Sequence, residues 1–221
     1  MPTWLRQRLR DVPAALIAAI VAVALTAAAF AVVRTKAAGA PVTAAFRFED
    51  AACTLPPAAA ATFGGALTAA EVATIRRTAR RELEDAYAGT RIRFTDGTDA
   101  FWHVAVQPAI RGRKALADAG HSIALGPLGG VGELSFTVLA MSAIRFAPAG
   151  ASRAAIVDGI GRGIGRAAVH ELAHQIVATA AMDNNSDPDS YEYSTFIRAS
   201  QYYGTLHWGQ AWPIVRQKIG R

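Results

Sequence analysis

Two histidines and a glutamate in the last third of the chain have the residue types of a catalytic metal site. They are His170, Glu171 and His174, in the order H-E-x-x-H. Residues four apart on a helix lie one turn apart on the same face, so the two imidazoles can bind one ion. Zinc accepts imidazole nitrogen at about 2.0–2.1 Å, and the intervening glutamate can take a proton from a water that attacks a carbonyl carbon. The pattern therefore predicts zinc-dependent hydrolysis of peptide bonds.

A catalytic zinc site needs a third protein ligand, and the residues after His174 offer several. Residues 178–182, ATAAM, have high helix propensity, which predicts that the helix continues for two turns beyond His174. Asp183 would then lie about 13 Å from His174 along the helix axis, and it could bind the ion only if the helix ended earlier. The proline-containing loop 184–189 allows the chain to reverse, which places Glu192 in the first turn of a following helix. Three further candidate ligands are Asp187, Asp189 and His207.

The segment Gly165–Tyr193 resembles the zincin metallopeptidases through its H-E-x-x-H motif on a helix. The resemblance implies an α+β, zincin-like domain with a small mixed sheet and a long active-site helix. It implies bound Zn²⁺, Glu171 as the catalytic base, and a peptide or protein substrate. It also implies an edge strand that binds the substrate backbone beside the active-site helix, and residues 123–136, IALGPLGGVGELSF, are the candidate for it.

The third ligand separates the zincin subgroups. The chain is not a standard metzincin, because Val177 stands at the helix-breaking glycine of that pattern and Ala180 at its third histidine. The layout is closest to gluzincins, in which a glutamate on the next helix is the third ligand, and this makes Glu192 the first choice. Phe196 stands where gluzincins often have an aspartate. Asp183 is the alternative and resembles the aspartate of aspzincins, although the G-T-x-D context of that group is absent.

Two other side chains are candidates for stabilising the tetrahedral oxyanion, namely Tyr193 and His207. The same residues are compatible with two other functions. One is a non-catalytic metal-binding or interaction domain on a zincin scaffold. The other is a membrane-anchored binding protein in which the motif belongs to an ordinary core helix.

The N-terminal segment 13–33, PAALIAAIVAVALTAAAFAVV, contains no charged residue. As a helix it would span roughly 31 Å, about the hydrocarbon thickness of a bilayer. Basic residues occur in the flank 1–12 and again just after the segment, which favours a single-pass anchor with the N-terminus inside. The alternative is a signal segment that is cleaved, leaving a secreted protein. Both interpretations place the domain outside the cytoplasm, with residues 34–44 as a linker and 45–221 as the metallopeptidase domain.

The pattern along the domain predicts alternating strands and amphipathic helices. We expect a strand at 44–50, a helix opened by Thr68 with Glu71 in a capping box and closed near Gly89, and a hairpin of 91–95 with 101–107. A basic loop follows, then a Gly-rich strand and turn at 121–136, and an element of undecided type at 138–146. The later elements are helices at 152–182, 190–203 and 210–219.

Composition excludes some functions. The formal charge is +6, but residues 41–221 hold 18 basic and 16 acidic residues, so no basic surface for nucleic acid is indicated. The four glycines of 159–165 lack the complete G-x-G-x-x-G fingerprint and no strand feeds them, which argues against a nucleotide loop and for tight packing of the helix against the sheet. The single cysteine, Cys53, excludes an intrachain disulfide.

Overall fold

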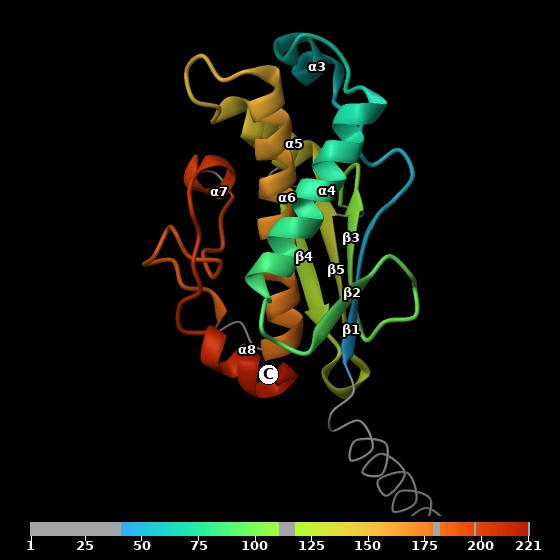
Figure 1. The fold of residues 1–221 in the computed structure, drawn as a ribbon, viewed down its shortest axis with the longest axis vertical. Helices are drawn as coiled ribbons and strands as arrows, with labels where there is room; N and C mark the ends of the chain where they lie inside the picture. The colour runs from blue at the N-terminus through green and yellow to red at the C-terminus, as the bar shows by residue number, and fades with distance from the viewer. Residues whose placement is uncertain (1–40, 111–117, 179–181, 197, 221) are drawn as a thin grey trace, which may run out of the picture. The chain divides into compact units, whose positions relative to one another are not determined.

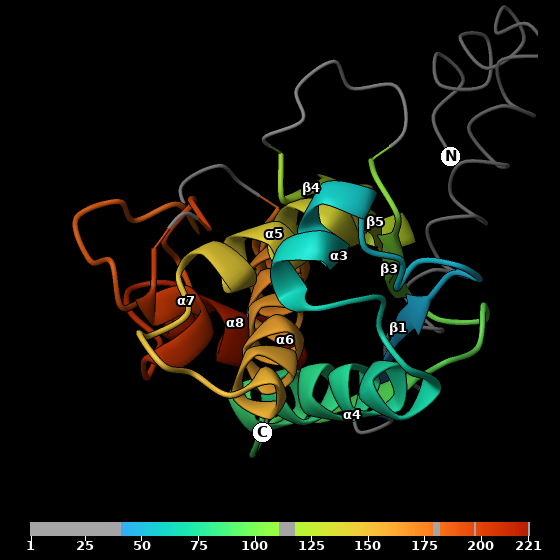
Figure 2. The same cartoon turned by 90° about the horizontal axis from the view of Figure 1, so that it is seen from above.

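The computed structural model describes residues 41–110, 118–178, 182–196 and 198–220. These form a five-stranded mixed sheet with α4 and α6 side by side on one of its faces (Figures 1 and 2). The strands are β1 Val42–Phe48, β2 Ile92–Thr95, β3 Trp102–Gln107, β4 Gly120–Ala124 and β5 Gly130–Ser135. The helices are α3 Pro57–Phe63, α4 Ala69–Ala86, η1 Gly126–Leu128, α5 Phe136–Arg145, α6 Arg153–Val177, α7 Ser200–Tyr203 and α8 Trp212–Ile219. The predicted α+β class is confirmed.

The strand order is β2-β1-β3-β5-β4, with β1 between its two parallel neighbours β2 and β3. The predicted hairpin of 91–95 with 101–107 is therefore wrong, although both segments are strands. Ala45 of β1 pairs with Thr95 at the end of β2, and Ala44 pairs with Trp102 at the start of β3. The short loop between them thus crosses β1 at nearly one level of the sheet. Alternation of apolar residues indicates a strand but does not identify its partner.

The only antiparallel pair in the described sheet is β4 with β5, and β4 forms the sheet edge. β4 also lies against α6, the helix that carries the H-E-x-x-H motif. The predicted substrate strand, 123–136, covers only the last two residues of this edge strand and then η1 and the interior strand β5. The edge strand beside the motif is therefore the segment Gly120–Ala124.

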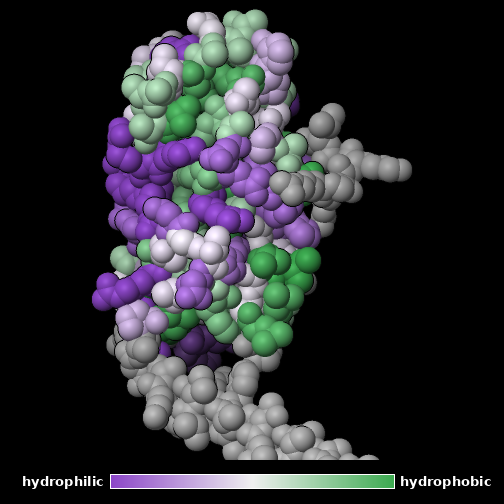
Figure 3. All heavy atoms as spheres, turned by 90° about the vertical axis from the view of Figure 1, so that its right-hand side faces the viewer, coloured by the Kyte–Doolittle hydropathy of each residue, from purple (hydrophilic) through white to green (hydrophobic). Residues whose placement is uncertain are grey.

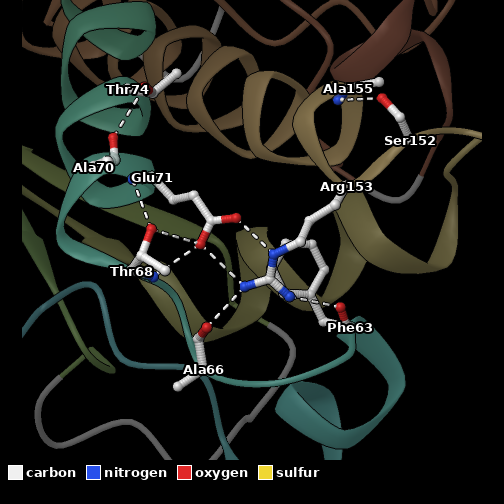
Figure 4. Close-up of polar contacts among 9 residues, drawn as sticks. All are labelled: Phe63, Ala66, Thr68, Ala70, Glu71, Thr74, Ser152, Arg153 and Ala155. Carbon is white, nitrogen blue, oxygen red and sulfur yellow. Dashed lines mark hydrogen bonds and ion pairs between the residues drawn. The ribbon is translucent and has the colours of Figure 1, made fainter.

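Helix α4 begins with the predicted capping box. The Thr68 hydroxyl accepts from the Glu71 amide, and the Glu71 carboxylate accepts from the Thr68 amide at 2.8 Å. Arg153 at the start of α6 donates to both oxygens of the same carboxylate, at 2.6 and 3.0 Å, and its guanidinium lies 3.9 Å from the centre of the Phe63 ring (Figure 4). This Arg153 bond, followed by the Thr68 amide, lowers the pKa of Glu71 to about 2. The helix ends at Ala86, before the predicted Gly89.

Helices α4 and α6 approach closely because α6 carries glycine at the contact. A Cβ on Gly165 would lie 2.5 Å from the Ala79 carbonyl oxygen, and one on Gly161 would lie 2.9 Å from that of Ile75. The other two glycines of the run, Gly159 and Gly163, face the rings of Tyr203 and Tyr202. The prediction of tight packing is confirmed, but the partners are α4 and the C-terminal tyrosines rather than the sheet.

Other elements differ from prediction in their extent. The undecided segment 138–146 belongs to helix α5, and the closing helix 210–219 corresponds to α8. Helix α3 has no counterpart among the predicted elements. Strand β1 starts at Val42, three residues before the predicted start of the domain at Ala45.

The predicted membrane segment 13–33, with its flank 1–12, lies outside the described residues. Within the part of the chain that the structure describes, none of the helices has both the length and the apolar character needed to cross a bilayer.

Candidate metal centre

Helix α6 ends three residues after His174, at Val177. Ala178 adopts the left-handed conformation, with a φ of 60°, and its amide donates to the His174 carbonyl at 2.8 Å. The Lys218 ammonium of α8 donates to the Val177 carbonyl at 2.9 Å and satisfies another of the last carbonyls. The prediction that the helix continues for two more turns is therefore wrong.

This early end brings Asp183 to the two histidines. Its Oδ1 lies 3.1 Å from His174 Nε2 and 3.4 Å from His170 Nε2, and the two Nε2 atoms are 3.1 Å apart. Burial falls across the group: the side chain of His170 is 5% exposed, that of His174 22% and that of Asp183 35%. His170, His174 and Asp183 form a group that could hold a metal ion. The donor set therefore has a buried side and a side open to solvent.

The three donor separations fit one ion. Bonds of about 2.05 Å at the tetrahedral angle place two ligand atoms about 3.3 Å apart, whereas a right angle places them about 2.9 Å apart. The observed range of 3.1–3.4 Å lies closer to the tetrahedral value. Two imidazoles with one carboxylate are also a known set of protein ligands for catalytic zinc.

His170 is oriented for binding by the main chain of the loop that follows the helix. Its Nδ1 lies 2.9 Å from the carbonyl oxygen of Tyr191, so the Nδ1 proton is donated to that oxygen. The lone pair of Nε2 is then free to bind a metal ion together with His174 and Asp183. Such a contact fixes the tautomer of a metal-binding histidine. Burial, and secondarily the neighbouring His174, lowers the pKa of His170 to about 4. The imidazole is therefore neutral at pH 7, as a ligand must be.

Asp183 is positioned by its neighbours in sequence. Met182 is fully buried in the core. The Asn184 amide donates to the Glu192 carbonyl at 2.8 Å, which closes the intervening loop. Asp183 therefore lies between the buried Met182 and the hydrogen-bonded Asn184, with its carboxylate directed at the histidines.

Glu192, the first choice for the third ligand, has a different set of partners. Its side chain is buried, and its Oε1 accepts from the amides of Gly209 and Ala211, both at 2.8 Å. These amides precede α8, so the carboxylate stabilises the N-terminus of that helix. The predicted helix 190–203 is wrong, because among the described residues of this range only Ser200–Tyr203 are helical, and Ser190 instead forms an isolated bridge with His207. The structure thus brings the alternative candidate, Asp183, to the histidines.

Glu171 faces the edge strand. Its Oε2 accepts from the Ser122 hydroxyl at 2.7 Å, and the side chain is almost fully buried. A Cβ on Gly120 would lie 2.5 Å from the other carboxylate oxygen, so any larger residue at that position of β4 would force the Glu171 side chain to shift. The neighbour of His170 in sequence is therefore a carboxylate held in one orientation by β4.

The two candidate oxyanion stabilisers have other partners. The Tyr193 hydroxyl accepts from Arg198 at 2.6 Å, and the same guanidinium lies over the Tyr193 ring. The His207 side chain is 59% exposed, and its Nε2 lies 2.9 Å from Asp187. The Asp189 carbonyl accepts from the His207 amide. These contacts organise the loop after the motif, and none of them reaches the donor group.

Sequence reasoning missed three positioning residues, namely Ser122, Tyr191 and Lys218. Tyr191 acts through its main-chain carbonyl, and Lys218 acts on the main-chain carbonyl of Val177. Ser122 lies on a strand whose partner helix is remote in sequence. None carries a local signal. The resemblance pointed to a strand in the right region, and only the alternation of side chains along β4 would have selected Ser122.

No family model, no curated protein and no solved structure matches this chain.

Proposed function

We propose that this protein is a zinc-dependent peptide hydrolase of zincin type. The observation that carries the proposal is the meeting of three donor atoms, two imidazole nitrogens and one carboxylate oxygen, within 3.1–3.4 Å of one another. Glu171, the buried glutamate of the H-E-x-x-H motif, directly follows His170 in sequence. Asp183 replaces Glu192 as the proposed third ligand.

The roles of the residues follow from their contacts. His170, His174 and Asp183 would hold Zn²⁺, which when bound supplies a Lewis acid and acidifies water. Glu171 is the proposed general base, and the Ser122 hydroxyl keeps its carboxylate in one orientation. The Tyr191 carbonyl holds the His170 ring in the tautomer that presents Nε2.

We infer the identity of the ion from the motif. Two histidines and one carboxylate also suit non-haem iron. A glutamate that directly follows the first histidine of the H-E-x-x-H motif, however, is the arrangement that metal-dependent hydrolysis uses, because it supplies the base as well as the ligands. We therefore propose zinc, with a peptide or protein substrate.

We also propose that the domain is attached to a membrane through residues 13–33 and lies outside the cytoplasm. The support is the uncharged length of that segment and the basic residues on both sides of it. Cleavage of the segment would instead give a secreted form with the same domain.

The test uses the full chain purified in detergent. Bound metal is measured by mass spectrometry in the wild type and in the variants His174→Ala, Asp183→Asn and Glu171→Gln. The wild type is expected to hold one zinc per chain, and the first two variants are expected to lose it. Glu171→Gln should keep zinc while losing cleavage of a broad peptide library by two or more orders of magnitude, since it removes only the base.

Each other outcome has a definite meaning. Wild-type protein without stoichiometric zinc at neutral pH rejects the metal site. Zinc without cleavage in the wild type supports the non-catalytic metal-binding domain instead. Equal cleavage by wild type and Glu171→Gln rejects the role of the glutamate.

A further inference from the structure

Five exposed apolar side chains gather around the turn between β4 and β5. Leu128 is 74% exposed, and its four companions are between 39% and 49% exposed: Phe101, Ile123, Leu125 and Val131. Ile123 and Val131 are directly opposite each other in the β4–β5 pair. The segment 120–132 contains no acidic residue, lysine or arginine. We call these five residues the hairpin patch, and Figure 3 shows a patch of apolar surface in the lower half of the face that it draws.

The hairpin patch is not part of the metal centre. Ser122 and Gly132 point toward α6, where they meet Glu171 and Gln175. Ile123 and Val131 alternate with them and therefore face away from that helix. The patch thus lies on the side of the sheet opposite the proposed catalytic glutamate.

The turn is built to hold these side chains in place. The Leu125 amide donates to the Gly129 carbonyl at 2.8 Å, and the Gly130 amide donates to the Phe101 carbonyl at 3.2 Å. Gly129 has a φ of 95°, and a Cβ there would collide with the Phe101 carbonyl oxygen. The apolar residues therefore project from a tightly bonded turn rather than from a loose loop.

The patch lies at the end of the sheet where the chain enters β1. The Phe101 amide donates to the Thr43 carbonyl at 3.2 Å, one residue after β1 begins. Two consecutive main-chain bonds thus connect the start of β1 to the hairpin. Fully extended, residues 34–41 reach at most about 29 Å. A membrane segment ending at Val33 would hold this end of the sheet near the bilayer surface.

We propose that the hairpin patch inserts into the lipid interface of the membrane that carries residues 13–33. A convex, uncharged turn with leucine at its tip suits a soft apolar surface, where buried apolar area gives the binding energy. A short tether keeps the local concentration of lipid high, so a small patch is sufficient. The inference rests on the proposed membrane attachment and is independent of zinc chemistry. It orients the domain with the start of β1 toward the bilayer.

The test places an environment-sensitive fluorophore on single cysteines in the full chain, reconstituted into phosphatidylcholine–phosphatidylglycerol vesicles. In a Cys53→Ala background the labelled positions are Leu128→Cys, Met141→Cys and Val23→Cys. Met141 is the matched control, because it is an exposed apolar residue on α5, which begins at the opposite end of β5. Quenching by lipids spin-labelled near the headgroup or in the acyl chain reports contact with the bilayer. The thermal transition of each labelled chain confirms that it is folded.

Strong loss of emission from Leu128→Cys with headgroup-labelled lipid, and little from Met141→Cys, is the expected result. Quenching of Val23→Cys by acyl-labelled lipid without quenching of Leu128→Cys overturns the inference and leaves the attachment standing. Absence of quenching at Val23→Cys rejects the attachment and the inference with it. Equal quenching at positions 128 and 141 also overturns the inference, because it indicates unspecific adhesion of the domain.

Discussion

Replacing Asp183 by asparagine should remove most of the stabilisation of the fold by zinc, while replacing Glu192 by glutamine should not. The two carboxylates have different partners: Asp183 meets the histidine nitrogens, and Glu192 meets the amides of Gly209 and Ala211. Asparagine keeps the shape of aspartate but removes the negative charge that a ligand to zinc supplies. The comparison therefore separates a ligand from a structural carboxylate.

The size of the effect follows from linkage. An ion that binds only the folded chain, at a free concentration of 100 times its Kd, stabilises it by about 2.7 kcal/mol. For a domain of this size each kcal/mol shifts Tm by about 2–4 °C, so chelation should lower the wild-type Tm by about 5–11 °C. Loss of a residue that only supports a ligand can weaken metal affinity by ~100-fold. Loss of one of the three ligands themselves should weaken zinc affinity by at least as much. At the same free zinc this leaves Asp183→Asn about 0.4 kcal/mol of stabilisation, or about 1–2 °C.

The assay is thermal unfolding of the full chain in buffered zinc and in excess chelator. Glu192→Gln should unfold at lower temperature than the wild type under both conditions, because a buried acceptor loses its charge. The difference between the Tm of Glu192→Gln in buffered zinc and its Tm in chelator should stay close to the same difference in the wild type. A zinc-dependent shift that survives in Asp183→Asn but disappears in Glu192→Gln would refute the assignment and restore Glu192 as the ligand.

Three further outcomes test the fold around the site. Gly165→Ala should lower the free energy of unfolding in urea by about 1–2 kcal/mol, because the overlap with Ala79 outweighs the gain in helix propensity. Lys218→Met should cost about 0.5–1.5 kcal/mol in the same assay, since the Val177 carbonyl loses its donor. Glu71, with its pKa lowered to about 2, stabilises the fold above pH 4.5 and loses this contribution as the pH falls toward 2. Glu71→Gln should therefore flatten the dependence of the urea midpoint on pH between those limits.

Matched controls are available for two of these changes. Gly97→Ala should be close to neutral, because its new Cβ would meet only the Thr95 hydroxyl at 3.4 Å. Lys218→Arg keeps a donor within reach of the same carbonyl and should recover most of the stability. A Gly165→Ala variant as stable as the wild type would contradict the close approach of α4 and α6.

Local signals predicted the parts of the fold that local physics controls. The capping box at Thr68 and the i,i+4 pairing of His170 with His174 require only residues within one turn of helix. The strands on either side of β1 could be recognised, but their pairing depends on which edge of the sheet each one reaches. Pattern alone does not contain that information.

The proposed third ligand shows most clearly what the local sequence cannot predict. Its identity depends on where α6 stops, and the sequence ATAAM favours continuation. The helix stops at Val177 with an alanine in the left-handed conformation, where Lys218 of a distant helix supplies a donor. A tertiary contact thus overrides local propensity. Asp183 can meet the histidines only if α6 ends early, and α6 does end at Val177.

The contacts of Lys218 and Glu192 also set the order in which the site can form. Both connect the motif region to α8, which follows the motif in the chain and ends at Ile219. A chain that is synthesised or exported from its N-terminus presents His170 and His174 before the residues that hold Asp183 beside them. We therefore expect the full donor set only after α8 has docked. A chain interrupted before α8 would carry the motif without a complete metal centre.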